Sequence, residues 1–352
     1  MERLTRWSRA AARWAGLAAV SVAVALAFDA VHLPAAFLFG PLVTAMAARL
    51  AGLRFTLIRP VAQGSQALIG GLIGAALTPA IVATFLADWP ILTAIVAATI
   101  LFASITGWAL SRFGVVPGTT GVWGSAPGAA SGMVIQAEGN GGDVRLVAFM
   151  QYLRVLFVAS GASIGSWLWL GGSRAAPHAL FEPVDPKAFA LTLAVIAVTG
   201  VLGGRLKLAA GTMMLPLFTT AFLHGAGLVD FVLPRWLMVG AYTALGWNIG
   251  LRFTREAVMH AARALPWIVA SILALMIFSG AMALILVEWF AIDPLTAYLA
   301  TSPGGMDTVA IIAASTPVDV SFVMALQVLR SLAINIFGAP LSRLVAARLP
   351  RH

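Results

Sequence analysis

Two glutamine–arginine pairs carry most of the chemistry that this sequence offers. Gln151 precedes Arg154 by three residues, Gln327 precedes Arg330 by three, and both pairs lie inside apolar runs. This spacing places each pair on one face of a helix. An arginine at membrane depth costs roughly 2.5–3.5 kcal/mol on insertion scales unless it is paired or hydrated. The pairs therefore indicate either a clamp for a carboxylate or another oxyanion, which a guanidinium suits, or an anchor onto neighbouring carbonyl groups. The two roles are compatible.

Both pairs belong to a stretch that the chain contains twice. The first copy, GSAPGAASGMVIQAEGNGGDVRLVAFMQYLR, ends at Arg154, and the second, ATSPGGMDTVAIIAASTPVDVSFVMALQVLR, ends at Arg330, 176 residues later. The same offset relates glycines further upstream: Gly64, Gly70 and Gly74 correspond to Gly240, Gly246 and Gly250. An internal duplication predicts that the function lies at the interface of two related halves.

Each copy begins with a segment rich in helix breakers. Serine followed by proline is typical of a helix start, so we expect Ser302 and Pro303 to begin a half-helix in the membrane. Two such N-termini, one from each copy, would form an anion site; the alternative is a glycine-rich packing kink. The candidate binding residues are the two glutamine–arginine pairs together with Ser125, Pro127, Gly128, Ser131, Ser302, Pro303, Gly304, Asp307 and Asn335.

The two copies differ at one informative position, where Ser131 of the first corresponds to Asp307 of the second. A single carboxylate in such a segment is either a coupling site for a proton or cation, or the partner of a buried arginine. Asp143 and Asp319 precede long apolar runs, and we interpret both as helix caps.

Composition places the chain in the membrane. Hydrophobic residues make up 61% of it and charged residues 10%, and its mean hydropathy is +0.95. A soluble domain has about 25% charged residues. The sequence has no cysteine, no HxxxH spacing among its five histidines and no nucleotide motif, so we expect no metal, no cofactor and no enzymatic activity. The basic residues are scattered between apolar runs, which argues against binding of nucleic acid.

The apolar runs predict ten membrane spans in two sets of five. The first set is 14–31, 33–51, 61–80, 89–111 and 144–170; the second is 188–203, 208–225, 235–252, 264–287 and 319–342. Segments 117–137 and 296–315 are predicted to be re-entrant or broken helices, which are tolerated where they line a cavity. An odd number of spans per half inverts the second half, and the positive-inside rule then places both termini in the cytoplasm.

The fold that we expect is therefore an all-α integral membrane protein with two inverted-topology repeats, each of about five transmembrane helices and one broken segment. The first repeat is predicted at 1–170 and the second at 188–352, joined by a periplasmic linker at 171–187.

The sequence resembles the AbrB-type duplicated membrane proteins of bacteria. The resemblance runs from LPAAFLFGP at 33–41 to RSLAINIFGAP at 330–340, and its specific part is GSAPGAASGM and TSPGGMD. It implies a protein of the bacterial inner membrane without an assigned substrate. The labels often given to such proteins, ammonia monooxygenase or regulator, find neither metal ligands nor a DNA-binding module here. The fold is also analogous to secondary transporters of the sodium/bile-acid and proton-antiporter type.

We interpret the chain as a secondary transporter of a small solute, anionic and similar to an organic acid, that works by alternating access between the two repeats. The alternatives are a membrane-embedded regulatory or sensory protein that binds a ligand without moving it and, with less support, a membrane enzyme. The expected partners are the lipid bilayer and the solute. The sequence leaves open the substrate, coupling to H⁺ or Na⁺, the direction, assembly into a homo-oligomer, and whether the broken segments are hairpins or crossing helices.

Overall fold

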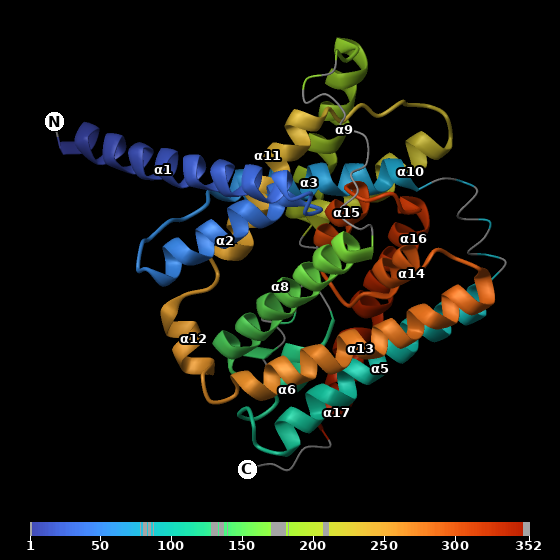
Figure 1. Cartoon of the computed structure of the whole chain (residues 1–352). Helices are drawn as coiled ribbons and strands as arrows, with labels where there is room; N and C mark the ends of the chain where they lie inside the picture. The colour runs from blue at the N-terminus through green and yellow to red at the C-terminus, as the bar shows by residue number, and fades with distance from the viewer. Residues whose placement is uncertain are drawn as a thin grey trace.

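The computed structural model describes residues 2–77, 88–127, 140–169, 183–206 and 211–347, with positions 79, 83, 86, 133, 137, 138 and 181 between them. Within these ranges the side chains of residues 2–10, 307, 335, 338, 339 and 346 are not described. The described chain consists of helices joined by short connections (Figure 1).

The helices of the two halves follow one another in the same order. The first half contains α1 (Glu2–Ala30), α2 (Ala36–Leu50), α3 (Arg59–Ala76), α5 (Trp89–Arg112), α6 (Thr120–Ser125) and α8 (Val144–Trp169). The second half contains α9 (Pro186–Arg205), α10 (Gly211–Gly225), α11 (Arg235–Gly250), α12 (Arg255–Ala261), α13 (Leu265–Phe290), α14 (Pro294–Thr301), α15 (Met306–Ala314), α16 (Val320–Ala333) and α17 (Ala339–Ala346).

The chain is an all-helical membrane protein. Five described helices are long and apolar enough to cross a bilayer: Ala11–Ala30, Trp89–Arg112, Val144–Leu168, Pro186–Arg205 and Leu265–Phe290. The other five predicted spans also fall on helices, but these are shorter or more polar. The span predicted at 319–342 is interrupted, because α16 ends at Ala333 and a π-helix follows over Ile334–Gly338. Pro340 has no N–H for the carbonyl one turn earlier, and the hydrogen-bond register changes there.

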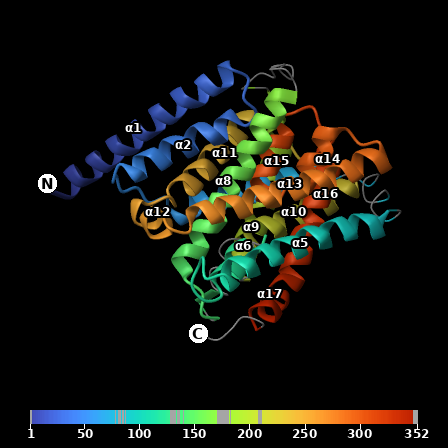
Figure 2. The same ribbon diagram turned by 60° about the horizontal axis from the view of Figure 1, so that its bottom comes forward.

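The helices form two groups, and each half contributes to both (Figures 1 and 2). In the first group α1, α2 and α3 pack with α9, α10 and α11; in the second α5, α6 and α8 pack with α13, α14, α15, α16 and α17. Helices α15 and α16 contact α3 and so join the groups. The halves are therefore interlocked rather than separate.

Glycines set the closest helix crossings of the first group. A Cβ on Gly70 of α3 would lie 2.2 Å from Met213 O of α10, and one on Gly246 of α11 would lie 2.4 Å from Leu38 O of α2. Only a residue without a side chain permits this approach of two backbones. The repeated glycines of the sequence thus hold the two halves together at two equivalent crossings.

Helices α5 and α13 lie side by side and run in opposite directions (Figure 1). Near their midpoints the rings of Phe102 and Phe278 stack with centroids 4.2 Å apart and planes inclined by 4°. Stacked aromatic pairs contribute about 0.5–1.5 kcal/mol beyond their buried area. These two phenylalanines are also 176 residues apart, so α5 and α13 meet at corresponding positions.

The short helix α12 connects α11 of the first group to α13 of the second, and a hydrogen bond fixes it to the start of α8. His260 Nε2 lies 2.7 Å from Asp143 Oδ2. Burial raises the pKa of the Asp143 carboxyl, but its hydrogen bonds with His260 and with two backbone N–H groups lower the pKa more, so the net shift is downward.

Candidate functional site

Both broken segments are places where a helix ends, not where one begins. Helix α14 ends at Thr301 and α15 begins only at Met306, so Ser302 and Pro303 lie between them. In the first half α6 ends at Ser125 and Pro127 follows shortly after. The helix start expected at Ser302–Pro303 was therefore wrong. Proline cannot continue a helix and confines the residue before it to extended backbone, and Ser302 has φ −56° and ψ 135°.

The backbone atoms that these helix ends present are carbonyl oxygens, which carry the negative end of the helix dipole. In a regular helix the N–H of Pro127 would bond Trp123 O, but proline has none. Gln151 supplies the missing donor: its Nε2 lies 2.9 Å from Trp123 O and 2.8 Å from Ala126 O. Arg154 Nη1 adds a 2.9 Å hydrogen bond to Ala126 O.

The second half repeats this arrangement. Pro303 cannot bond Leu299 O, and Gln327 Nε2 lies 2.8 Å from that oxygen and 3.2 Å from Ser302 O. Arg330 donates to Ser302 O and, at 2.8 Å, to Gly304 O. The acceptors Leu299 and Ser302 follow Trp123 and Ala126 by the same 176 residues as the donors. One difference matters: the Ser302 hydroxyl also donates to Leu299 O at 2.9 Å.

Within each pair the arginine and the glutamine also bond each other. Arg154 Nη2 lies 2.9 Å from Gln151 Oε1, and Arg330 Nη2 lies 2.5 Å from Gln327 Oε1. Each amide is thus held with its nitrogen toward the helix end and its oxygen toward the guanidinium. The anchor role of the arginines is present in the structure, and the oxygen-binding fork of each guanidinium is aimed at the chain itself.

The caps of α8 and α16 follow the sequence interpretation. Asp143 Oδ1 accepts from Leu146 N at 3.1 Å, and Asp319 Oδ1 accepts from Phe322 N at 3.0 Å. These bonds fix the first turn of the helices on which the glutamine–arginine pairs lie.

The guanidinium groups are buried and carry charge that their hydrogen bonds do not neutralise. Arg154 is 4% exposed and Arg330 5% exposed, and the two are near enough to repel each other. Among the described side chains neither has a carboxylate partner. The Nε of each also has no hydrogen-bond partner.

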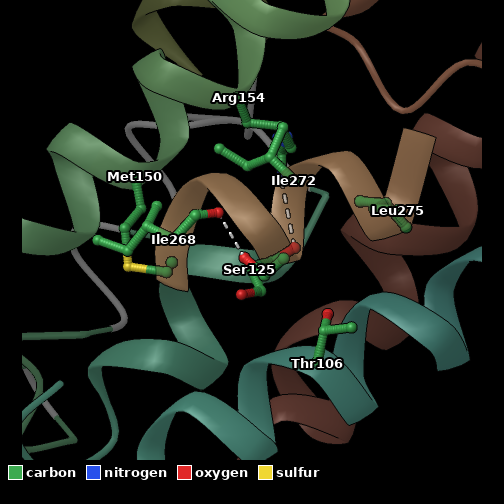
Figure 3. A pocket seen from close by; sticks show the side chains of 9 residues that line it. Thr106, Ser125, Met150, Arg154, Ile268, Ile272 and Leu275 are labelled. Atoms are coloured by element: carbon green, nitrogen blue, oxygen red, sulfur yellow. Dashed lines mark hydrogen bonds between the residues drawn. The ribbon is translucent and has the colours of Figure 1, made fainter. Parts of the chain in front are cut away.

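A small pocket with a volume of about 10 Å³ lies beside Arg154 (Figure 3). This is close to the space that one water molecule needs. Its polar lining consists of Arg154 from α8, Ser125 from α6, Thr106 from α5 and Ser271 from α13. The Ser125 hydroxyl is buried and has no partner, and Figure 3 shows this side chain between Arg154, Ile268 and Thr106.

Comparison with known proteins gives the family of this chain. Residues 37–346 match the family described as "Transition state regulatory protein AbrB". The chain is 41% identical over 342 residues to "Putative regulator AbrB" of Escherichia coli K12, an alignment that covers 97% of this chain and 98% of that protein. The chain belongs to the AbrB family. A more distant relative is "Uncharacterized protein YhjN" of Bacillus subtilis 168, 24% identical over 296 residues, with 80% of this chain and 77% of that protein aligned.

The structure of this AbrB family member brings the predicted site residues together only in part. The two glutamine–arginine pairs meet Ser125, Ser302 and Gly304 at the helix ends, and Pro127 and Pro303 cause those ends. Gly128 and Ser131 lie outside the described residues, and the side chains of Asp307 and Asn335 are not described.

The sequence interpretation of this AbrB family member missed the wall of the pocket that α5 and α13 form. Thr106 and Ser271 are isolated hydroxyls in apolar helices, and each donates to a carbonyl of its own helix, Thr106 to Ala103 O and Ser271 to Ile268 O. Such residues carry no motif in a single sequence. Over the part of the chain that the structure describes, no group of histidines and carboxylates has the geometry of a metal site.

Proposed function

We propose that this AbrB family member is a secondary transporter that moves a small anionic solute by alternating access between two inverted halves. The observation that carries the proposal is the pair of buried guanidinium groups that have no carboxylate partner among the described side chains. Carbonyl dipoles stabilise such charges but do not cancel them. A solute anion would cancel one, and the repulsion between Arg154 and Arg330 strengthens its attraction.

The inversion of the halves is part of this proposal and has its own support. Corresponding helices α5 and α13 run antiparallel and meet through corresponding phenylalanines, as two copies of opposite orientation do. The paired hydrogen bonds at the helix ends repeat at one offset. The proposal takes 1–170 and 188–352 as the repeats and 171–187 as their linker. It also places the protein in the bacterial inner membrane with both termini in the cytoplasm, because basic residues then concentrate on that side.

A regulatory function is the second candidate, because the relative in Escherichia coli is described as a regulator. A membrane sensor would use the same buried arginines to bind an anion without moving it. Flux separates the two functions, since both predict binding and only one predicts movement across the bilayer.

The test is uptake of labelled small carboxylates by proteoliposomes under an inward proton or sodium gradient. Wild-type protein should show uptake that depends on one gradient, and Arg154→Gln and Arg330→Gln should each reduce it at least tenfold. Both variants lose hydrogen bonds to a helix end, so their circular dichroism and monodispersity must match wild type. Wild-type uptake in both folded variants would remove the anion argument, and binding without uptake would favour the sensor.

A further inference from the structure

The pocket beside Arg154 has no counterpart beside Arg330, although the surrounding helices correspond. The positions equivalent to Thr106 and Ser271 are Met282 and Ile95, and both are apolar. Two of the three hydroxyl groups of the pocket thus have no equivalent in the second half. The polar space is confined to one side of the molecule.

The third hydroxyl differs in its bonding. Ser125 corresponds to Thr301, whose hydroxyl donates to Ser279 O and Ala297 O, both at 3.0 Å. Ser125 Oγ is buried without a partner, and so is Arg154 Nε. Two unsatisfied donors near one pocket require an acceptor that the described chain does not supply. A carboxylate offers two oxygens and accepts from a guanidinium with good geometry.

The rest of the pocket is apolar. Met150 of α8 and three residues of α13, Ile268, Ile272 and Leu275, complete the lining. Their side chains suit a short alkyl group. No second cationic side chain lines the pocket among the described residues, so a second carboxylate or a phosphate would enter without a counter-charge, at a large desolvation cost.

We propose that the solute is a short-chain monocarboxylate that binds on the first-half side alone. Its carboxylate accepts from Arg154 and from the Ser125 hydroxyl, and its alkyl group lies against α13. The proposal rests on the proposed function for transport but not for binding. The small volume requires α13 to move outward from α6 when the anion enters, and it limits the alkyl chain to a few carbons.

The test compares ligands by thermal shift on the purified full-length protein in detergent. Sodium acetate, propionate and butyrate are titrated against sodium chloride at equal ionic strength, with disodium succinate and sodium phosphate as anions of other classes. Ligand that binds only the folded state raises the melting temperature as its concentration passes Kd. We expect a rise with the monocarboxylates and none with succinate or phosphate.

Matched variants place the site. Ser125→Ala should weaken monocarboxylate binding about tenfold, and Ser271→Leu, which fills the pocket, should abolish it. Thr301→Val removes the hydroxyl at the equivalent position of the second half and should leave the affinity unchanged. Ser271→Ala deletes a hydroxyl that is bonded within its own helix, so it shows whether α13 itself folds normally without that group.

Three results would overturn the proposal. Equal weakening by Thr301→Val and Ser125→Ala would show that the site is not confined to the first half. A larger shift with succinate or phosphate would show the wrong solute class, and no shift with any anion would show that the pocket holds water alone. The two proposals fail in distinguishable ways, because monocarboxylate binding without flux refutes transport only. Gradient-driven flux that Ser125→Ala and Ser271→Leu do not alter refutes the pocket only.

Discussion

Replacing Gln151 by leucine should destabilise the protein more than the same change at Gln327. In the first half Gln151 is the donor that compensates for Pro127 at Trp123 O. Leucine preserves volume but leaves that oxygen and an N–H of Arg154 unpaired, at about 1–3 kcal/mol each. Burying leucine in place of an amide recovers part of this. We expect a net loss of about 2–4 kcal/mol in the free energy of unfolding.

The second half has a substitute donor. When Gln327 becomes leucine, the Ser302 hydroxyl still donates to Leu299 O, so the unpaired group is chiefly an N–H of Arg330. Alanine occupies the corresponding position 126 in the first half and offers no hydroxyl. The expected loss for Gln327→Leu is therefore smaller than for Gln151→Leu by about 1 kcal/mol. Adding Ser302→Ala to Gln327→Leu should bring the two halves to similar values.

The assay is unfolding in mixed micelles by titration with sodium dodecyl sulfate, followed by far-ultraviolet circular dichroism. Gln63→Leu on the exposed side of α3 is the matched control, with an expected change within about 0.5 kcal/mol. Equal losses for Gln151→Leu and Gln327→Leu, or a larger loss for the latter, would refute the argument that each glutamine replaces the N–H that its proline lacks.

Three further predictions concern the contacts around the site. Gly246→Ala should destabilise the protein by about 1–3 kcal/mol, because its Cβ would overlap the backbone of α2; a melting curve measures it. Phe102→Ala and Phe278→Ala should show a coupling energy of about 0.5–1.5 kcal/mol in a double-mutant cycle. Because the pKa of Asp143 is lowered in the folded protein, its ionised form stabilises the fold at neutral pH, and this stabilisation is lost as the pH falls through that lowered pKa. The melting temperatures of wild type and Asp143→Asn should therefore converge below about pH 4, and His260→Ala should move the convergence to higher pH.

Each of these predictions has a control or a contrary result. Gly240→Ala lies on the same helix as Gly246, and nothing surrounds its Cβ within 4 Å, so it should not destabilise. Strictly additive effects of the two phenylalanine changes would mean that the rings do not stabilise each other. A difference between wild type and Asp143→Asn that stays constant from pH 3 to 7 would remove the linkage to ionisation.

The sequence predicts the helices and the interhelix glycines well, because both depend on local patterns that repeat. Apolar runs locate the spans, and the fixed offset between Gly70 and Gly246 marks two equivalent crossings. The caps at Asp143 and Asp319 follow from residue type and position alone. In each case the signal lies within a few residues of the structure that it specifies.

The orientation of the broken segments was not predicted, because serine and proline occur at both helix starts and helix ends. A nearer signal exists. Asp293 Oδ2 accepts from Thr296 N at 3.0 Å and caps α14, and Pro294 follows it at the first helical position. A helix that starts there must end before Pro303. The pocket had no signal of this kind, since Thr106 and Ser271 become neighbours only when α5 and α13 pack.

The stack of Phe102 on Phe278 has a consequence for the history of the chain. A residue meets its own copy only where a two-fold axis passes between them, and this is the contact that a symmetric homodimer makes. If the two halves arose by duplication, the same phenylalanine once faced itself across a subunit boundary. Because α5 and α13 run antiparallel, the two subunits of that ancestor lay in the bilayer with opposite orientations. A half-length ancestor of this protein therefore had to insert both ways, and fusion of the two genes fixed one orientation for each copy.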